Sequence, residues 1–299
     1  MDTALEKNWE VYALKYAERS DRTRKESFIF DLWSKASDQK DGFSDVLKNK
    51  ILTNLFYEPS TRTSSSFYSA MVRQGGSVIP INNVKFSSAI KGESLEDTII
   101  TMGTMSDCIV LRHPEIGSVD KAAKVSSVPI INAGDGEGEH PTQTLLDGFT
   151  IYYNHKKNID NLRITMVGDL KNGRTVKSLV KLLSRYSGNH FNFVSPKDLR
   201  FPQDSIPKKS FETDKIENVI ADTDVLYVTR VQTERGSDHQ YSLSTEQLNL
   251  LPKNSIVMHP LPRVNEIPRD FDNDPRAKYF DQMIYGLWCR MVLLEGIMS

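Results

Sequence analysis

Apolar positions along the chain follow two periods that alternate from one segment to the next. Short apolar runs, the pattern of buried strands, lie at residues 51–58, 77–82, 107–112, 128–134, 161–169, 190–196, 224–231 and 255–262. Apolar residues three or four positions apart, the pattern of helices, lie at residues 66–75, 95–105, 174–187 and 244–251. Strands that alternate with helices predict an α/β fold of doubly wound, parallel sheets with helices on both faces.

The two ends of the chain are predicted to be helical. Residues 7–22 and 27–38 are rich in charge and carry apolar side chains at helical spacing. Residues 282–298 are apolar nearly all round, which is typical of a helix that is buried on every side. We therefore expect this last helix to pack back against the first half of the chain.

The chain is long enough for two domains, because its 299 residues compare with about 150 for a typical domain. A helical stretch with an apolar face gives way to polar residues at 151–161. We place the boundary there and expect two sheet domains linked by long helices. The first spans residues 1–152 and is joined by a C-terminal helix at 284–299, and the second spans residues 153–283.

Loops that follow strands are the usual ligand sites of such folds. Residues 56–67, FYEPSTRTSSSF, follow one predicted strand and lead into a helix. Hydroxyl groups at Ser60, Thr61 and Thr63 can donate hydrogen bonds there, Arg62 adds charged donors, and the helix N-terminus adds backbone N–H groups. One helix cap needs one hydroxyl group, so the surplus favours a phosphate-sized anion over plain capping.

Other strand ends carry further polar residues. Arg112 lies at the end of one strand, in LRHP. His140 and Gln143 open a helix after a glycine-rich loop. A histidine at a helix N-terminus is disfavoured as a cation, so a neutral ring that binds a carbonyl group is one interpretation. A structural histidine is the alternative, and these residues alone do not separate the two.

Arginines gather at two strand ends in the second half. Arg174 begins a helix after the segment VGDLKNG, and Arg230, Gln232 and Arg235 follow another strand. Guanidinium groups bind carboxylates through two parallel hydrogen bonds, so three arginines suggest carboxylate recognition. Solvated turns are the alternative.

Two more segments carry candidate residues. Ser87 and Lys91 lie in a polar loop that, taken alone, is typical of a solvated surface. Leu261 lies between two prolines in MHPLP, where the bond to Pro262 can adopt the cis form.

Composition and charge exclude several classes of protein. Thirty-eight basic residues against 39 acidic ones leave a net charge of −1, without the basic bias of a nucleic-acid or anionic-membrane surface. Two distant cysteines in apolar surroundings favour buried thiols and a reducing compartment. The first residues lack the pattern of a secretory signal, and no apolar run reaches the roughly 20 residues of a membrane span. We expect a cytoplasmic protein.

Motifs of competing chemistries are missing from the sequence. It contains no G-x-G-x-x-G dinucleotide fingerprint, no G-x-x-x-x-G-K-[ST] phosphate loop and no G-x-S-x-G nucleophile elbow. Neither H-E-x-x-H nor C-x-x-C occurs, so we expect no metal site.

Taken together and in this order, the segments resemble the catalytic chain of the aspartate carbamoyltransferase family. They are FYEPSTRTSSSF, KGES, LRHP, INAGDGEGEHPTQTLLD, GDLKNGRTVKSL, RVQTER, MHPLPRVNEI and DPRAKYFDQMIYGLWCRMVLL. The resemblance covers residues 50–299, and the first 48 residues carry little of it. Ornithine carbamoyltransferases differ, with SMRTR in the phosphate loop and HCLP where this chain has HPLP. RVQ and the lysine of KGES suit aspartate as the second substrate.

The resemblance implies an enzyme that transfers the carbamoyl group of carbamoyl phosphate to L-aspartate. The products are N-carbamoyl-L-aspartate and phosphate, and the reaction belongs to pyrimidine (UMP) biosynthesis. No cofactor, nucleic acid or membrane is expected, and the expected assembly is a homotrimer with shared active sites. The sequence leaves regulatory subunits open. The alternatives are a carbamoyltransferase for ornithine or another amine, and an inactive relative that serves as a scaffold.

The resemblance also implies roles for individual residues. Those expected to bind carbamoyl phosphate are Ser60, Thr61, Arg62, Thr63, Ser87, Lys91, Arg112, His140, Gln143, Leu261 and Pro262. Those expected to bind L-aspartate are Lys91, Arg174, Arg230 and Gln232. Those expected to be catalytic are Arg62, Thr63, Lys91, Arg112 and His140.

Within these sets the roles differ. Thr63, Arg112 and His140 are expected to polarise the carbonyl oxygen, whereas Gln143 and the Leu261 backbone face the carbamoyl amine. The loop with Ser87 and Lys91 is expected to reach into the site of a neighbouring subunit. Glu58 is expected to pair with Arg174 and Arg235 when the domains close on both substrates.

Overall fold

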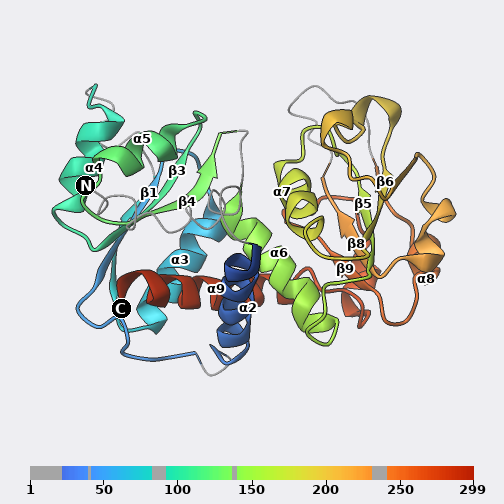
Figure 1. Ribbon diagram of the computed structural model, residues 1–299, viewed down its shortest axis with the longest axis horizontal. Coiled ribbons are helices and arrows are strands. Elements are labelled where there is room, and N and C mark those ends of the chain that lie inside the picture. The colour runs from blue at the N-terminus through green and yellow to red at the C-terminus, as the bar shows by residue number, and fades with distance from the viewer. Residues whose placement is uncertain (1–21, 40–41, 83–91, 137–139, 231–240) are drawn as a thin grey trace. The chain divides into compact units, whose positions relative to one another are not determined.

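A computed structural model describes most of the chain (Figure 1). The described residues are 22–39, 42–82, 92–136, 140–230 and 241–299. In these parts of the chain, no helix has both the length and the apolarity that crossing a membrane requires. Cys108 and Cys289 are buried thiols, as expected.

The chain divides into two compact units. Unit 1 comprises Met1–Leu145 with Tyr285–Ser299, and unit 2 comprises Leu146–Ile284. The chain passes from one unit to the other within two helices, α6 (Pro141–Asn154) and α9 (Asp281–Met298). The sequence had placed these two crossings after residues 152 and 283.

Unit 1 is built on a four-stranded parallel sheet with the strand order β2-β1-β3-β4. Its strands are β1 (Ile51–Phe56), β2 (Ser77–Ile81), β3 (Cys108–His113) and β4 (Ile130–Asp135). Its helices, besides parts of α6 and α9, are α2 (Arg22–Ser37), α3 (Thr61–Arg73), α4 (Leu95–Gly103) and α5 (Ser118–Val125). All four strands were predicted from the apolar runs.

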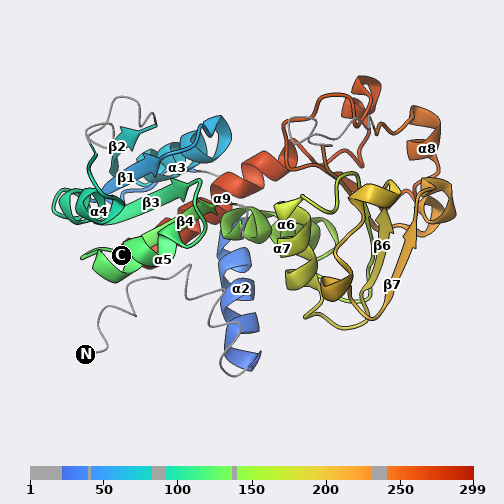
Figure 2. The same cartoon turned by 90° about the horizontal axis from the view of Figure 1, so that it is seen from above.

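Helices cover both faces of this sheet (Figures 1 and 2). Leu55 of β1 belongs to a buried cluster with residues of α4 and α5. The side chain of Asn54, its neighbour, points to the other face and donates from Nδ2 to the carbonyl of Ser64 in α3. Because successive strand residues face opposite sides, α3 lies on one face and α4 and α5 on the other.

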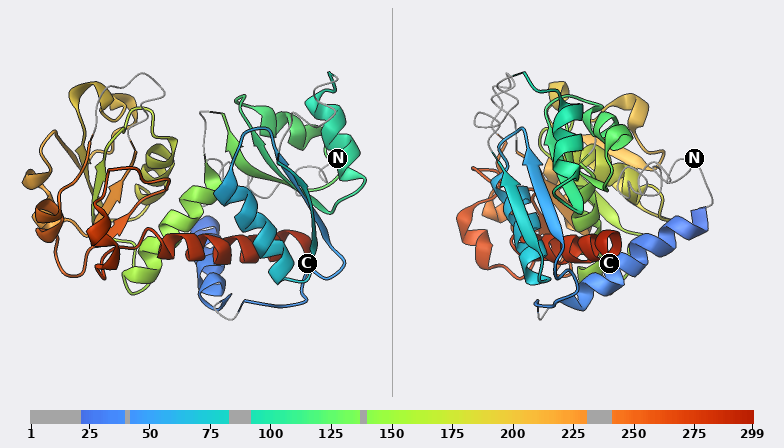
Figure 3. Two further views of the ribbon diagram at one scale, coloured as in Figure 1. Left: turned by 180° about the vertical axis from the view of Figure 1, so that it is seen from behind. Right: turned by 90° about the vertical axis from the view of Figure 1, so that its left-hand side faces the viewer.

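The last helix packs within unit 1, as its apolar sequence suggested. Arg290 of α9 donates to Ser66 Oγ at 3.2 Å, and its guanidinium group lies over the ring of Phe67. Helix α2 lies beside the end of α9 (Figure 3), and Trp33 of α2 donates from Nε1 to the carbonyl of Leu145. Helices α3 and α9 therefore pack together within the unit, and α2 packs against α9.

Unit 2 is built on a five-stranded parallel sheet with the strand order β7-β6-β5-β8-β9. Its strands are β5 (Arg163–Val167), β6 (His190–Val194), β7 (Ser210–Thr213), β8 (Val225–Val228) and β9 (Ile256–Met258). Its helices, besides parts of α6 and α9, are α7 (Arg174–Leu183) and α8 (Thr245–Asn249). Short 3-10 turns are η4 (Lys197–Leu199), η5 (Gln203–Ser205), η6 (Ile216–Asn218), η7 (Ile220–Asp222) and η9 (Arg269–Asn273). The sequence pattern missed β7, a short and half-exposed edge strand.

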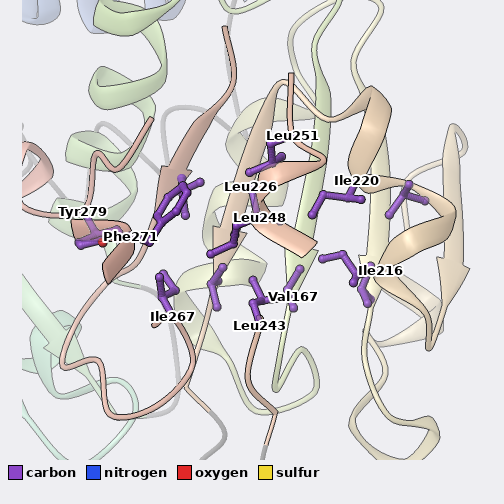
Figure 4. Packing of buried hydrophobic residues seen from close by; sticks show 14 residues of the cluster. Val167, Ile216, Ile220, Leu226, Leu243, Leu248, Leu251, Ile267, Phe271 and Tyr279 are labelled. Atoms are coloured by element: carbon purple, nitrogen blue, oxygen red, sulfur yellow. The ribbon is translucent and has the colours of Figure 1, made fainter. Parts of the chain in front are cut away.

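An apolar core covers one face of this second sheet (Figure 4). Leu226 of β8 packs there with Leu248 of α8 and with residues of the 3-10 turns. Tyr227, the next residue of β8, points to the opposite face, where its hydroxyl group donates to Asp147 of α6 at 2.7 Å. The alternation along β8 thus assigns α8 and α6 to opposite faces.

In each sheet, successive strands are added toward one edge up to a certain point in the chain and toward the other edge after it. In unit 1 the two directions meet between β1 and β3, and in unit 2 between β5 and β8. Loops that leave neighbouring strands there turn to opposite faces and open a crevice at the carboxyl edge of the sheet. Most of the predicted site residues in the described chain follow these strands.

Gly168 marks how closely the backbone packs at one of these points. A Cβ atom on Gly168, whose φ is +116°, would lie 2.3 Å from the carbonyl oxygen of Thr229, after β8. We expect Gly168→Ala to lower the free energy of unfolding by about 3 kcal/mol, because it combines a backbone clash with a strained φ. Urea unfolding followed by circular dichroism measures the change.

The control for this variant is Gly296→Ala. Gly296 lies in α9, and a Cβ atom there meets nothing within 4 Å. This variant should keep or slightly raise the stability, because alanine favours a helix by about 1 kcal/mol over glycine. Equal unfolding midpoints for the two variants would contradict the close backbone approach at Gly168.

Candidate active site

Helix α3 follows β1 in the chain and begins at Thr61, five residues earlier than the apolar pattern indicated. Ser60 precedes the helix without capping it through its side chain, Thr61 and Arg62 are exposed in its first turn, and Thr63 is buried. The first N–H groups of a helix have no partner inside the helix, and the helix dipole adds partial positive charge. This turn therefore combines backbone, hydroxyl and guanidinium donors in the manner of an anion site.

Two further serines of this segment, Ser64 and Ser66, hold the helix in place. Ser64 Oγ donates to Asn82 Oδ1 at 2.7 Å, and Ser66 Oγ accepts from Arg290. Both hydroxyl groups are engaged inside unit 1, so these two residues contribute to the packing of the helix.

Arg112 forms an ion pair with Glu58 at the carboxyl edge of this sheet. Its Nε donates to Glu58 Oε2 at 3.1 Å, and the two side chains are 13% and 31% exposed. Strand register causes the pairing, because Phe56 of β1 is aligned with Arg112 of β3 and the backbone of Tyr57 donates to the Arg112 carbonyl. Gly134 of β4 lies beside the Arg112 side chain, where a Cβ atom would make ordinary contacts of 3.4–3.7 Å, so its φ of +136° rather than a lack of space favours glycine there.

His113 supports the strand end next to Arg112. Its Nδ1 lies 2.8 Å from Ser118 Oγ, and its ring packs against that of Tyr57, with centroids 4.6 Å apart. Burial lowers the pKa of His113 although nearby carboxylates oppose the shift, so the ring is neutral at pH 7. Asp135 accepts from the backbone of Ser118 and closes the same loop. The sequence alone predicted no role for His113, although its position next to Arg112 at the strand end was the available signal.

His140 directly precedes α6 and Gln143 lies in its first turn, and both side chains are buried. The His140 carbonyl accepts from the backbone and from the hydroxyl group of Thr144, which ties the residue to the start of the helix. Pro141 occupies the first helical position, where its missing N–H group is not needed. Both side chains thus lie at the N-terminus of a helix that follows β4.

The arginines of unit 2 lie at the carboxyl ends of neighbouring strands. Arg174 is the first residue of α7, which follows β5, and Arg230 follows β8. The turn before Arg174 is held by Asp169, which is buried and accepts from the backbone and side chain of Asn172. Both arginine side chains are partly exposed.

Leu261 lies in the segment after β9. The peptide bond between Leu261 and Pro262 is cis, which confirms the prediction, and Leu261 has a φ of +55°. Its backbone N–H donates to His259 Nδ1 at 2.9 Å.

The structure thus divides the predicted residues by unit. Unit 1 brings together, at one sheet edge, the residues Glu58, Ser60, Thr61, Arg62, Thr63 and Arg112. Unit 2 places Arg174, Arg230, Leu261 and Pro262 at the carboxyl edge of its own sheet. Four predicted residues lie outside the described part of the chain: Ser87, Lys91, Gln232 and Arg235. Among the described residues, no group of three or more His, Cys, Asp or Glu side chains is arranged to hold a metal ion.

Two family models match almost the whole chain. The model described as "Aspartate/ornithine carbamoyltransferase, carbamoyl-P binding domain" matches residues 20–153, and the "Asp/Orn binding domain" of the same family matches residues 160–297. The chain therefore belongs to the aspartate/ornithine carbamoyltransferase family.

Individual relatives are similar over nearly their full length. The aspartate carbamoyltransferase catalytic subunit of Thermoplasma volcanium is 50% identical over 274 residues, which are 86% of this chain and 88% of that protein. Aspartate transcarbamoylase of Trypanosoma cruzi, solved with N-(phosphonacetyl)-L-aspartic acid, matches with a TM-score of 0.84 and 41% identity over 91% of both chains. The catalytic subunit from M. jannaschii matches with a TM-score of 0.83 and 45% identity over 90% of this chain and 92% of that one. These comparisons confirm the fold, the family and the class of enzyme expected from the sequence.

The ion pair of Glu58 predicts a competition for Arg112. An anion that binds Arg112 must either displace the Glu58 carboxylate or bind close to its negative charge, which is unfavourable. We expect Glu58→Gln to bind inorganic phosphate about threefold more tightly, the scale of a partly exposed ion pair. Titration calorimetry without any amino acid measures this affinity.

The matched control is Glu115→Gln, which neutralises an exposed carboxylate on the loop after β3. Its phosphate affinity should stay close to that of the unaltered chain, because the ion pair of Arg112 with Glu58 is kept. Phosphate binding by Glu58→Gln that is weaker than in the unaltered chain would contradict the competition.

Proposed function

We propose that this chain transfers the carbamoyl group of carbamoyl phosphate to the amine of L-aspartate and releases N-carbamoyl-L-aspartate and phosphate. The observation that carries the proposal is the anion site at the start of α3, flanked by Arg112, in a member of this family. A phosphate group carries negative charge and several acceptor oxygens, which suit hydroxyl, backbone and guanidinium donors.

Carbamoyl phosphate is held and activated mainly by residues of unit 1. Ser60, Thr61, Arg62 and Thr63 bind the phosphate oxygens through hydroxyl, guanidinium and backbone donors. Arg112, His140 and Thr63 donate to the carbonyl oxygen and stabilise the negative charge that develops on it, a contribution of a few kcal/mol per donor. Gln143 and the Leu261 backbone bind the carbamoyl amine. The departing phosphate accepts the proton from the attacking amine, so the reaction needs no separate protein base.

Aspartate is bound by cationic side chains of unit 2. Arg174 and Arg230 offer guanidinium groups to its two carboxylates, and Gln232, outside the described residues, is expected to assist. Ornithine carries an ammonium group where aspartate has a carboxylate, so the same arginines repel it. Structures of the Trypanosoma cruzi enzyme with carbamoyl aspartate and phosphate, and with aspartate and phosphate, support this choice.

The oligomeric state and the cellular role proposed for the chain are those expected from its family. We propose a homotrimer in which Ser87 and Lys91 of one subunit complete the site of its neighbour, and a cytoplasmic role in pyrimidine biosynthesis. The pairing of Glu58 with Arg174 and Arg235 in the substrate-bound chain stays a prediction. Regulatory subunits stay open.

The acceptor assay tests the reaction itself. The purified chain is incubated with carbamoyl phosphate and either L-aspartate or L-ornithine, and the carbamoylated product is quantified. We expect product with aspartate and at least a hundredfold less with ornithine, the scale of a misplaced charge in a charged site. Product with ornithine alone would overturn the choice of acceptor. No product with either, together with no thermal stabilisation by N-(phosphonacetyl)-L-aspartic acid, would favour the scaffold alternative.

Mixing two inactive variants tests the shared site. Arg62→Ala removes a donor of the phosphate turn, and Lys91→Ala removes the residue proposed to act across the subunit boundary. When the two variants are unfolded, mixed and refolded together, some hybrid trimers contain one intact site, so part of the activity should return. Each variant refolded alone is the control, and activity that stays at this level after mixing would count against subunit sharing.

A further inference from the structure

The segment at residues 259–262, HPLP, has its backbone N–H groups bound inside the protein. Pro260 and Pro262 have no N–H group. The N–H of His259 donates to Gln282 Oε1 at 3.2 Å, and that of Leu261 donates to His259 Nδ1 at 2.9 Å. What this segment can offer a ligand is therefore carbonyl oxygens and no N–H group.

Gln282, in the first turn of α9, is fixed in one orientation by its partners. It is fully buried; its Nε2 donates to Asp147 Oδ1 while its Oε1 accepts from the backbone of His259. A flipped amide would set its oxygen against a carboxylate and its NH₂ group against an N–H group, so the orientation is determined. Asp147 is held in turn by the Tyr227 hydroxyl group. A chain of buried hydrogen bonds thus runs from β8 through α6 and α9 to the segment.

The ring of His259 is also held in one form. Its Nδ1 accepts from the Leu261 N–H, so in the neutral ring the proton is on Nε2. That nitrogen lies 3.7 Å from Glu266 Oε2, which itself accepts from the backbone of Val264 at 2.7 Å. The carboxylate therefore faces the protonated nitrogen and favours the tautomer that binds Leu261.

We propose that Gln282 and His259 are positioning residues that occupy the N–H groups of this segment, so that it selects an amine over a methyl group at the carbamoyl end of the substrate. This inference rests on the proposed function, in which the Leu261 backbone faces the carbamoyl amine. Neither residue touches the substrate in the proposal. They act by holding the backbone and by removing its donors.

The two ligands that the segment distinguishes differ in a single chemical group. Carbamoyl phosphate carries an NH₂ group where acetyl phosphate carries a methyl group of similar size. A fixed carbonyl oxygen accepts a hydrogen bond from the first and is left without a partner by the second, which is unfavourable in a buried site. A segment that moves or exposes an N–H group loses this discrimination, although both molecules still bind through their phosphate.

The test compares the two ligands on Gln282→Met, which removes both hydrogen bonds and nearly keeps the volume. Titration calorimetry on the full chain gives the dissociation constants of carbamoyl phosphate and acetyl phosphate. The preference for carbamoyl phosphate should fall about tenfold, the value of one hydrogen bond, while the KM for L-aspartate stays unchanged. An unchanged preference would overturn the proposal.

Asn189→Leu is the matched control for loss of stability. Asn189 is a buried amide whose Nδ2 donates to the carbonyls of Ile159 and Leu183, before strand β6 begins. Its loss removes buried hydrogen bonds away from the carboxyl edge of the sheet. This variant should unfold at a lower urea concentration and keep the ligand preference, and an equal loss of preference would show a general effect of stability and overturn the proposal.

A second pair of variants tests His259 and decides the question if Gln282→Met does not fold. His259→Asn keeps an oxygen acceptor near the position of Nδ1, whereas His259→Phe has none. The first should retain most of the preference and the second should lose about tenfold. Equal preferences in both would contradict the role of the ring nitrogen.

The binding measurement also separates this inference from the function it rests on. It needs no amino acid, so it can be read even when no product forms. Loss of preference in the variants with product from aspartate supports both statements. Unchanged preference with product from aspartate overturns the positioning role alone, whereas absence of product in the unaltered chain overturns the function.

Discussion

Parallel strands place their carboxyl ends at one edge of a sheet, and each unit uses the point where its strand order changes direction. In unit 1, alignment of Phe56 with Arg112 across β1 and β3 sets the ion pair of Arg112 with Glu58. In unit 2, β5 and β8 are neighbours at the corresponding point, and the loops after them lead to Arg174 and Arg230. Without this register the charged residues would be spread along the edges of both sheets.

The two units leave opposite kinds of backbone group for a ligand. The start of α3 presents the N–H groups of a first helical turn and the partial positive charge of the helix dipole, and these suit the oxygens of a phosphate. At residues 259–262 the N–H groups are bound to Gln282 and His259, and the segment offers carbonyl oxygens instead. In the proposed reaction the first property suits an anionic phosphate and the second suits a neutral amine.

Much of the fold was readable from the sequence, because the signals are local. The apolar runs predicted the strands from β1 to β9 with one exception, β7, whose short and half-exposed sequence lacks the pattern of a buried strand. The start of α3 was placed too late, since Thr61 and Thr63 resemble loop residues by composition although they begin the helix. The cis bond before Pro262 was predicted correctly from the neighbouring prolines and the family resemblance.

The sequence by itself determined the alternation of strands and helices, the motifs that follow the strands, and through them the family. These properties depend on residues that are close along the chain, where side-chain period and turn chemistry act. Only the tertiary structure decided the partners of those motifs. Asp147 and Gln282 are 135 positions apart and still form one hydrogen bond, and Glu58 meets Arg112 across two strands. Such pairs depend on strand register and helix packing, which no local pattern specifies.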